Sequence, residues 1–317
     1  MPVALSEWLE LIDGEYLRDF IVPGGAAIKF VVTDDDTSAK LNENFAEQAV
    51  RHGLVFAEAS SADARLHMMQ DIFFAVSRQI NWSIDAQRFV ETLFQGKGYQ
   101  WPKPNQPMDL REVAEANQVD ATILRREFNQ WLSSALMKDA NMAQDFRIAM
   151  TQLCLNCLVS ADNEEEPAAP ISEWLRGELR LIGSLKSAHI YSKITRHNAR
   201  AMFRSLCRWL RLTGHQGLFL TIDIRQVTRT AAMAADGVRY TSSAVMDAYE
   251  VLRQLLDDAD LYEGLFVVIM ADHAFTGGDP KRSVDAYVAL KMRIWDDVRA
   301  RARDNPLAPM VVIDAIG

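Results

Sequence analysis

Residues 217–223 have the sequence GLFLTID, an apolar run that ends in a carboxylate. Two runs of the same kind follow it, GLFVVIMA at 264–271 and MVVID at 310–314. Strands that are buried on both faces have such nearly continuous apolar sequences, and they occur in parallel sheets that helices cover. These three segments predict a parallel β-sheet in the second half of the chain.

The first half of the chain predicts two further strands, at 28–32 (IKFVV) and 54–58 (LVFAE). A helix is expected between them, over 41–52, with Gly53 at its carboxyl end. Apolar residues at helical spacing predict four more helices, over 5–20, 65–80, 243–256 and 284–303. Strands that alternate with helices form βαβ units, so we expect a three-layer α/β domain with five parallel strands.

The region 81–177 is different, because its helical segments are separated by breakers and it contains no convincing strand. We interpret it as a helical subdomain inserted into the α/β domain. The expected organisation is therefore 1–80 as the first half of the core, 81–177 as the insertion and 178–317 as the second half.

Composition limits the class of protein. The chain has 317 residues, 49% of them hydrophobic, and a net charge of −9. It shows neither a membrane-spanning apolar run nor a signal-peptide pattern, and three cysteines cannot form a disulfide framework, so we expect a cytoplasmic protein. Cys154 and Cys157 have the spacing of metal ligands, but without a second pair or nearby histidines we expect no metal site.

The segment after the first core strand, Thr33 to Lys40 (TDDDTSAK), is where an α/β nucleotide-binding domain carries its phosphate loop. It lacks the glycines that let the backbone curl around phosphates, and it contains Asp34, Asp35 and Asp36. Two like charges about 5 Å apart repel by roughly 3 kcal/mol at an effective dielectric constant near 20. We favour a solvated turn that caps the next helix; a carboxylate cluster for Mg²⁺ or Ca²⁺ is the alternative.

Two later strands also end in carboxylates. Asp223 has the position of the magnesium-binding aspartate of an ATPase, but Ile224 stands where the water-activating glutamate would follow. Asp272 and His273 follow the 264–271 strand. They could contact a phosphate or join Asp223 at a metal, although helix capping explains them more simply.

One segment opposes the overall acidity. Residues 179–222 contain eight Lys or Arg and no acidic residue. Arginines recur every fourth residue at Arg196, Arg200, Arg204 and Arg208, with Arg211 close behind, which aligns them on one helix face. This face over 196–211 is either a solvated surface, a docking surface for an acidic protein or a contact to DNA. The net charge favours a protein partner.

Three stretches resemble a known family in order and spacing. They are the opening from Trp8 through Tyr16 to the Gly24–Val32 strand, the segment Tyr191–Met202, and Tyr249–Asp258. Together they resemble ATP-binding proteins of BREX-type phage-defence gene clusters. The resemblance implies a P-loop ATPase core of the AAA+ kind that acts within a multi-protein defence assembly.

The family's GxxxxGK[ST] loop does not carry over onto Thr33–Lys40, whereas its magnesium-binding aspartate carries over to Asp223. We therefore expect a degenerate member with a vestigial nucleotide site formed by Gly24, Gly25, Thr37, Ser38, Lys40, Asp223 and Asp272.

The leading hypothesis is a pseudo-ATPase without a cofactor, a scaffold or regulatory subunit that binds other defence proteins, among them an active ATPase. The alternatives are an active ATP- and magnesium-dependent phosphohydrolase that uses Asp223 and Asp272, and a DNA-binding subunit of the same system.

Overall fold

The computed structural model describes residues 3–103, 108–159, 168–229, 237–295 and 305–314. Two compact units result, one of residues 1–76 and 215–317 and the other of Ser77–Gly214. In the part of the chain that the structure describes, every helix is too short or too polar to cross a lipid bilayer.

Unit 1 is built on a six-stranded, all-parallel sheet with the order β1-β8-β2-β7-β6-β3. The strands are β1 (Val3–Ala4), β2 (Ala26–Val32), β3 (Leu54–Ser60), β6 (Gly217–Asp223), β7 (Leu265–Ala271) and β8 (Met310–Asp314). All five expected strands are present. The sixth, β1, has two residues, too few to show a period in the sequence.

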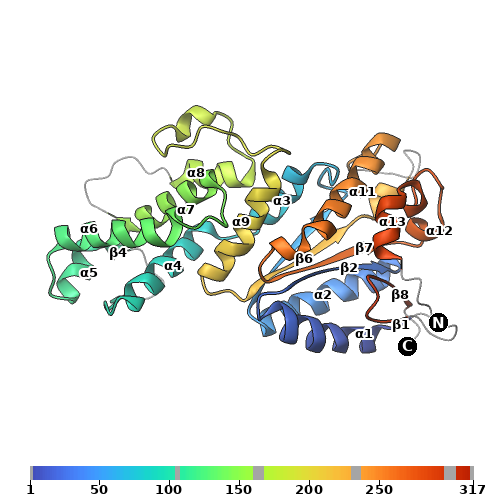
Figure 1. Ribbon diagram of the computed structural model, residues 1–317, viewed down its shortest axis with the longest axis horizontal. Coiled ribbons are helices and arrows are strands. Elements are labelled where there is room, and N and C mark those ends of the chain that lie inside the picture. Colours follow the sequence, from blue (N-terminus) through green and yellow to red (C-terminus); the bar gives the residue numbers. More distant parts are fainter. Residues whose placement is uncertain (1–2, 104–107, 160–167, 230–236, 296–304, 315–317) are drawn as a thin grey trace. The chain divides into compact units, whose positions relative to one another are not determined.

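Helices cover both faces of this sheet (Figure 1). On one face, Trp8 of α1 (Leu5–Leu11) packs on Phe45 of α2 (Asp35–Arg51), which in turn contacts Phe219 of β6 with ring centroids 4.9 Å apart. The π-helical segment η1 (Ile12–Ile21) adds Leu17 to the same core. On the other face, Phe275 stacks on Phe30 and meets Tyr249 edge-on. The α/β class with a P-loop-like parallel sheet is therefore confirmed.

Six further helices belong to unit 1 in the described part of the chain. They are α10 (Arg225–Thr228), α11 (Ser242–Asp257), η4 (Ala259–Leu261), α12 (Ala274–Gly277), η5 (Val284–Ala286) and α13 (Val288–Ile294); α3 (Met69–Ser77) crosses the boundary between the units. The helix expected over 284–303 is shorter, because η5 and α13 are separated at Tyr287, and its residues 296–303 lie outside the described part of the chain.

Unit 2 is helical. Its elements are α4 (Trp82–Gly96), β4 (Met108–Asp109), α5 (Leu110–Ala116), α6 (Ala121–Leu132), η2 (Ser133–Met137), α7 (Gln144–Asn156), β5 (Leu158–Val159), α8 (Ala168–Arg176), η3 (Ile182–Leu185) and α9 (Ala199–Leu212). The two-residue strands β4 and β5 pair with each other.

Helix α4 organises this unit through three aromatic contacts. Trp82 meets Phe146 of α7, Phe89 meets Trp209 of α9, and Phe94 stacks on Phe128 of α6. The contact to Trp209 ties α9 to the helical unit, so this unit extends to Gly214, whereas the sequence analysis placed the end of the insertion at 177. The basic segment therefore belongs to unit 2.

Candidate functional site

The carboxyl ends of β2, β7 and β6 form one edge of the parallel sheet, where ligands of open α/β sheets bind. Backbone hydrogen bonds connect the segments that leave these strands. The Thr33 amide donates to the Ala271 carbonyl at 3.0 Å, and the Ile224 amide donates to the Met270 carbonyl at 2.9 Å. Asp223 is the last residue of β6, Asp272 follows β7 directly, and Asp34 comes two residues after β2, so their backbones share this edge.

Asp34 begins helix α2 as its N-cap. Its Oδ1 accepts a hydrogen bond from the Thr37 amide at 2.7 Å, and this bond lowers the pKa of the Asp34 carboxyl. The capping interpretation of the sequence is confirmed. The expectation of a loop up to Lys40 is wrong, because α2 already begins at Asp35. Asp35 and Asp36 lie in the first turn, where carboxylates interact favourably with the helix dipole.

The hydroxyl residues expected at phosphates lie in the interior instead. Thr37 and Ser38 are each 1% exposed, and the Ser38 hydroxyl donates to the Met270 sulfur at 3.6 Å. Lys40, two residues further along α2, is exposed. These three residues therefore do not converge on one position at the edge of the sheet.

Asp223 is bound by Arg225, two residues later. The Arg225 Nη2 lies 2.7 Å from Asp223 Oδ2, and its Nε lies 2.9 Å from Oδ1. Charge-assisted pairs of this two-pronged kind are the strong ones. Hydrogen bonding to Asp223 raises the pKa of Arg225, so the guanidinium stays charged.

Arg225 also connects the two carboxylate-bearing segments, because its Nη1 forms an ion pair with Asp35 of α2. Arg229 approaches the same Asp35 carboxylate at 4.0 Å. The sequence alone did not single out Arg225, although it shows a cation two residues after a strand-ending aspartate. It could not show the pairing with Asp35, which lies 190 positions away.

Asp272 lies directly before His273, which is the N-cap of the short helix α12. The Asp272 Oδ1 accepts from the Ala274 amide at 3.1 Å and from the Thr228 hydroxyl at 3.3 Å. The second bond joins the segment after β7 to α10, which follows β6. Asp272 thus forms hydrogen bonds at the start of α12 and with α10, whereas the N-cap His273 forms no side-chain capping bond and is exposed.

Gly24 and Gly25 lie at the other end of β2. They connect η1 to the amino end of the strand, where the Gly25 amide donates to the Phe20 carbonyl at 2.9 Å. A Cβ on Gly25 would lie 2.7 Å from that carbonyl oxygen. A seven-residue strand is roughly 20 Å long, so the structure does not bring these glycines to the residues that follow β2.

The basic segment forms part of α9 in unit 2. Arg196 lies in a turn before the helix, which begins at Ala199, so the expected alignment from residue 196 begins one turn too early. Arg196 and Arg200 are exposed. Arg208 pairs with Asp139 at 3.0 Å, and the buried Arg204 Nε has no hydrogen-bond partner in the described structure. Arg211 is half-buried in the last turn.

Cys154 is buried on α7 and Cys157 is half-buried at its end. Burial raises the pKa of the Cys154 thiol well above its usual value and that of Cys157 to about 12. Within the described ranges, no three His, Cys, Asp or Glu side chains gather into a group that could hold a metal ion. Both cysteines therefore have the surroundings of packed, neutral thiols.

Comparison with known proteins places the chain in a family. No curated protein and no solved structure matches it. The model of the family described as BREX system ATP-binding protein BrxC/D matches residues 19–316, which include all of unit 2 and most of unit 1. The matched range begins after Tyr16 and includes the segments around Arg196 and Tyr249, in which the sequence resembles this family. The chain belongs to the BREX system ATP-binding protein BrxC/D family, whose members act in phage defence.

Proposed function

We propose that this chain has lost ATP hydrolysis and acts as a scaffold or regulatory subunit that binds other components of the BREX system. The observation that carries the proposal is the position of Arg225, whose guanidinium binds both Asp223 and Asp35. In an active ATPase, the aspartate that ends this strand interacts with magnesium. In this protein the Arg225 guanidinium contacts that aspartate.

A triphosphate with magnesium fits poorly at this edge. The Thr37 amide, which could face a phosphate, already donates to Asp34, and Asp34, Asp35 and Asp36 place negative charge at the start of α2. A divalent ion that approached Asp223 would be repelled by the Arg225 guanidinium, 2.7 Å from the carboxylate. Ile224 is fully buried and cannot activate water. We derive no hydrolytic step from these residues.

Calorimetric titration of ATP, with and without Mg²⁺, and a phosphate-release assay test this proposal. We expect no turnover above the background of the buffer, and no change in that background in the variant Asp223→Ala. Asp260→Ala is the matched control, because Asp260 is an exposed aspartate of the same unit, in η4. Micromolar ATP binding with turnover that Asp223→Ala abolishes and Asp260→Ala preserves would instead support the phosphohydrolase.

The basic face of unit 2 is the proposed surface for a protein partner. Its exposed members are Arg196 and Arg200, whereas the side chains of Arg204, Arg208 and Arg211 are half-buried. Charge complementarity with an acidic partner would speed association and select the partner.

Pull-down of the proteins from neighbouring genes tests this surface. The double variant Arg196→Glu with Arg200→Glu should recover less partner, and the loss should shrink as salt is added. Arg78→Glu is the matched control, because its side chain is 50% exposed in the same unit. Equal recovery with both variants would remove this face from the proposal.

A further inference from the structure

Helices α5 and α6 form a helix-turn-helix. Helix α5 ends at Ala116, and α6 begins at Ala121, so the turn consists of the four residues 117–120. A turn of three to four residues also joins the two helices of the DNA-binding motif, in which the second helix enters the major groove. Helix α6 would be that second helix.

Backbone hydrogen bonds order the turn between the two helices. Gln118 has a φ of 56°, in the left-handed region that glycine usually occupies. The Val119 amide donates to the Ala114 carbonyl at 3.0 Å and the Gln118 amide to the Glu115 carbonyl at 3.1 Å, which is the complete Schellman pattern at the end of a helix. Asp120 then caps α6, accepting from the Thr122 and Ile123 amides.

Packing decides which face of α6 is available. Leu124, Phe128 and Leu132 are buried, and Phe128 stacks on Phe94 of α4 at a centroid distance of 5.2 Å. Helix α4 thus supports the pair as a third helix. The opposite side is exposed and carries one apolar residue, Ile123, together with Thr122, Arg125, Arg126, Asn129 and Gln130. Arginine pairs with guanine and phosphate, and asparagine and glutamine pair with adenine, so this face has the side chains that read duplex DNA.

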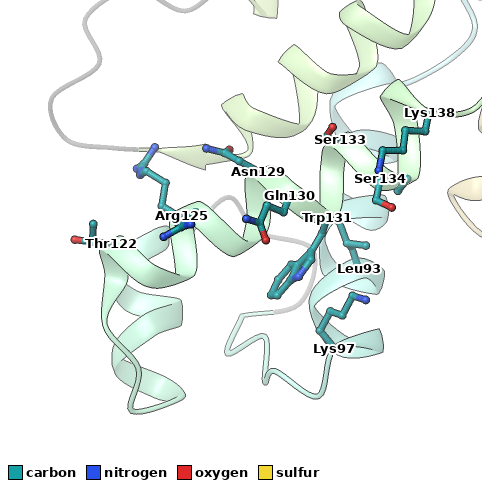
Figure 2. Close-up of a pocket in the computed structure, with 12 residues that line it drawn as sticks. Leu93, Lys97, Thr122, Arg125, Asn129, Gln130, Trp131, Ser133, Ser134 and Lys138 are labelled. Atoms are coloured by element: carbon teal, nitrogen blue, oxygen red, sulfur yellow. The ribbon is translucent and has the colours of Figure 1, made fainter.

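A cavity of about 1000 Å³ runs along this face (Figure 2). Four cationic residues line it, and no acidic residue does in the described structure. They are Lys97 just beyond α4, Arg125 and Arg126 of α6, and Lys138 just beyond η2. The one carboxylate on α6, Glu127, accepts a hydrogen bond from the Tyr99 hydroxyl at 2.9 Å. In a chain of net charge −9, four cations around one cavity form a local site for an anion.

The helix changes its winding at this cavity. Directly after α6, residues 133–137 form the π-helix η2, and Ser133 and Ser134 line the cavity together with Trp131 (Figure 2). Short π-helical turns within longer helices occur frequently at functional sites. Trp131 is held in place by Phe94 and Tyr99, at centroid distances of 5.5 Å each.

We propose that α6 is a recognition helix that enters the major groove of duplex DNA. Arg125, Arg126 and Asn129 contact base edges and phosphates, and Lys97 and Lys138 contact the phosphates beside the groove. This inference goes beyond the scaffold function and does not depend on it, because the site lies wholly within unit 2 and uses no residue of the nucleotide-site edge.

Fluorescence anisotropy of the full chain with a labelled duplex of about three helical turns tests the inference. The measurement is made without nucleotide, over a salt series from about 50 to 200 mM. We expect binding that weakens steeply as salt increases, and weaker binding of a single strand of equal length. Arg125→Ala with Arg126→Ala should weaken duplex binding by about tenfold or more and reduce the salt slope by about 2.

The matched control is Arg78→Ala, a half-exposed arginine of the same unit that lies outside the helix-turn-helix. It should retain the affinity and the salt slope of the unmodified chain. A far-ultraviolet circular dichroism melt of each variant verifies that unit 2 stays folded. No duplex binding at low salt, equal binding of the single strand, or an unchanged affinity in the double variant would overturn the proposal and leave α6 as a surface for a protein partner.

Discussion

Arg225 and Asp35 form an ion pair between two segments 190 positions apart, one after β6 and one at the start of α2. The same guanidinium holds Asp223 through two hydrogen bonds, of 2.7 and 2.9 Å. Two carboxylates that could face a metal ion are thus neutralised by one side chain of the protein. The edge of the sheet that binds ligands in related architectures is here connected internally by Arg225.

Removing the Arg225 guanidinium should destabilise unit 1 and make the carboxylates of Asp223 and Asp35 accessible to divalent ions. We expect Arg225→Ala to lower the free energy of unfolding by about 1–3 kcal/mol, because the half-buried Asp223 loses a charged hydrogen-bond partner. Millimolar Mg²⁺ should raise the melting temperature of this variant more than that of the unmodified chain. In a double-mutant cycle, the stability losses of Arg225→Ala and Asp223→Ala should together exceed the stability loss of the double variant. Strictly additive losses would show that the Arg225–Asp223 pair contributes nothing to stability.

A glycine in the turn at Gln118 should raise the free energy of unfolding, whereas the Arg225 substitution should lower it. Because Gln118 has a φ of 56°, Gln118→Gly should raise the free energy of unfolding of unit 2 by about 0.5–1 kcal/mol. Gln118→Val should lower it, since a β-branched residue is least tolerant of this region. Urea denaturation of the three proteins gives the order, and a glycine variant no more stable than the unmodified chain would argue against a left-handed residue here.

Lys29 of β2 should make stability depend on alkaline pH. The residue is 4% exposed, its Nζ donates to the Ala308 carbonyl at 2.9 Å, and burial lowers its pKa from 10.5 to about 8. Between these two values the unfolded chain binds more protons than the folded chain. The charged side chain therefore opposes folding below about pH 8, and this opposition is relieved as the pH rises towards 10.5.

The control is Lys29→Met, which keeps an unbranched chain without the charge. The free energy of unfolding of the unmodified protein should gain about 1.4 kcal/mol per pH unit relative to this variant within that window, and stay parallel to it below pH 8. Urea denaturation at a series of pH values measures the difference. If the free energies of unfolding of the two proteins stay parallel up to pH 10.5, the ammonium of Lys29 is solvated in the folded protein.

A substitution at Gly217, the first residue of β6, tests how closely this strand approaches the backbone at Gly264. Its φ is 142°, and a Cβ there would lie 2.0 Å from the Gly264 carbonyl oxygen, which accepts from the Leu218 amide. Gly217→Ala should therefore lower the free energy of unfolding by about 2–4 kcal/mol. Gly277→Ala is the control, because nothing lies within 4 Å of its added Cβ. Similar melting temperatures for both variants would contradict this close approach.

The apolar runs allowed the strands of unit 1 to be predicted closely from the sequence. Strand β6 has the expected bounds, 217–223, and β7 begins one residue after the expected start. Hydrophobic burial is a property of each strand alone, so its pattern appears in consecutive residues. The start of α2 is earlier than expected because a capping aspartate, not the first apolar residue, determines where a helix begins.

The helix-turn-helix was not recognised from the sequence. Its turn has no glycine, and Gln118 takes the left-handed conformation in a turn that the Schellman hydrogen bonds to Ala114 and Glu115 close. The sequence predicted five parallel strands but not their order in the sheet, β8-β2-β7-β6-β3. Strand order depends on how the connecting helices cross from one strand to the next.

The sequence by itself determined the parallel α/β class, the absence of a GxxxxGK[ST] motif and the family, because each depends on residues that are close together along the chain. Only the tertiary structure decided that Arg225 joins Asp223 to Asp35, that Gly24 and Gly25 lie at the far end of β2, and that part of the basic face is bound by Asp139. Charges act through space over a few ångströms, and the distances between segments that are remote in the sequence exist only once the chain is folded.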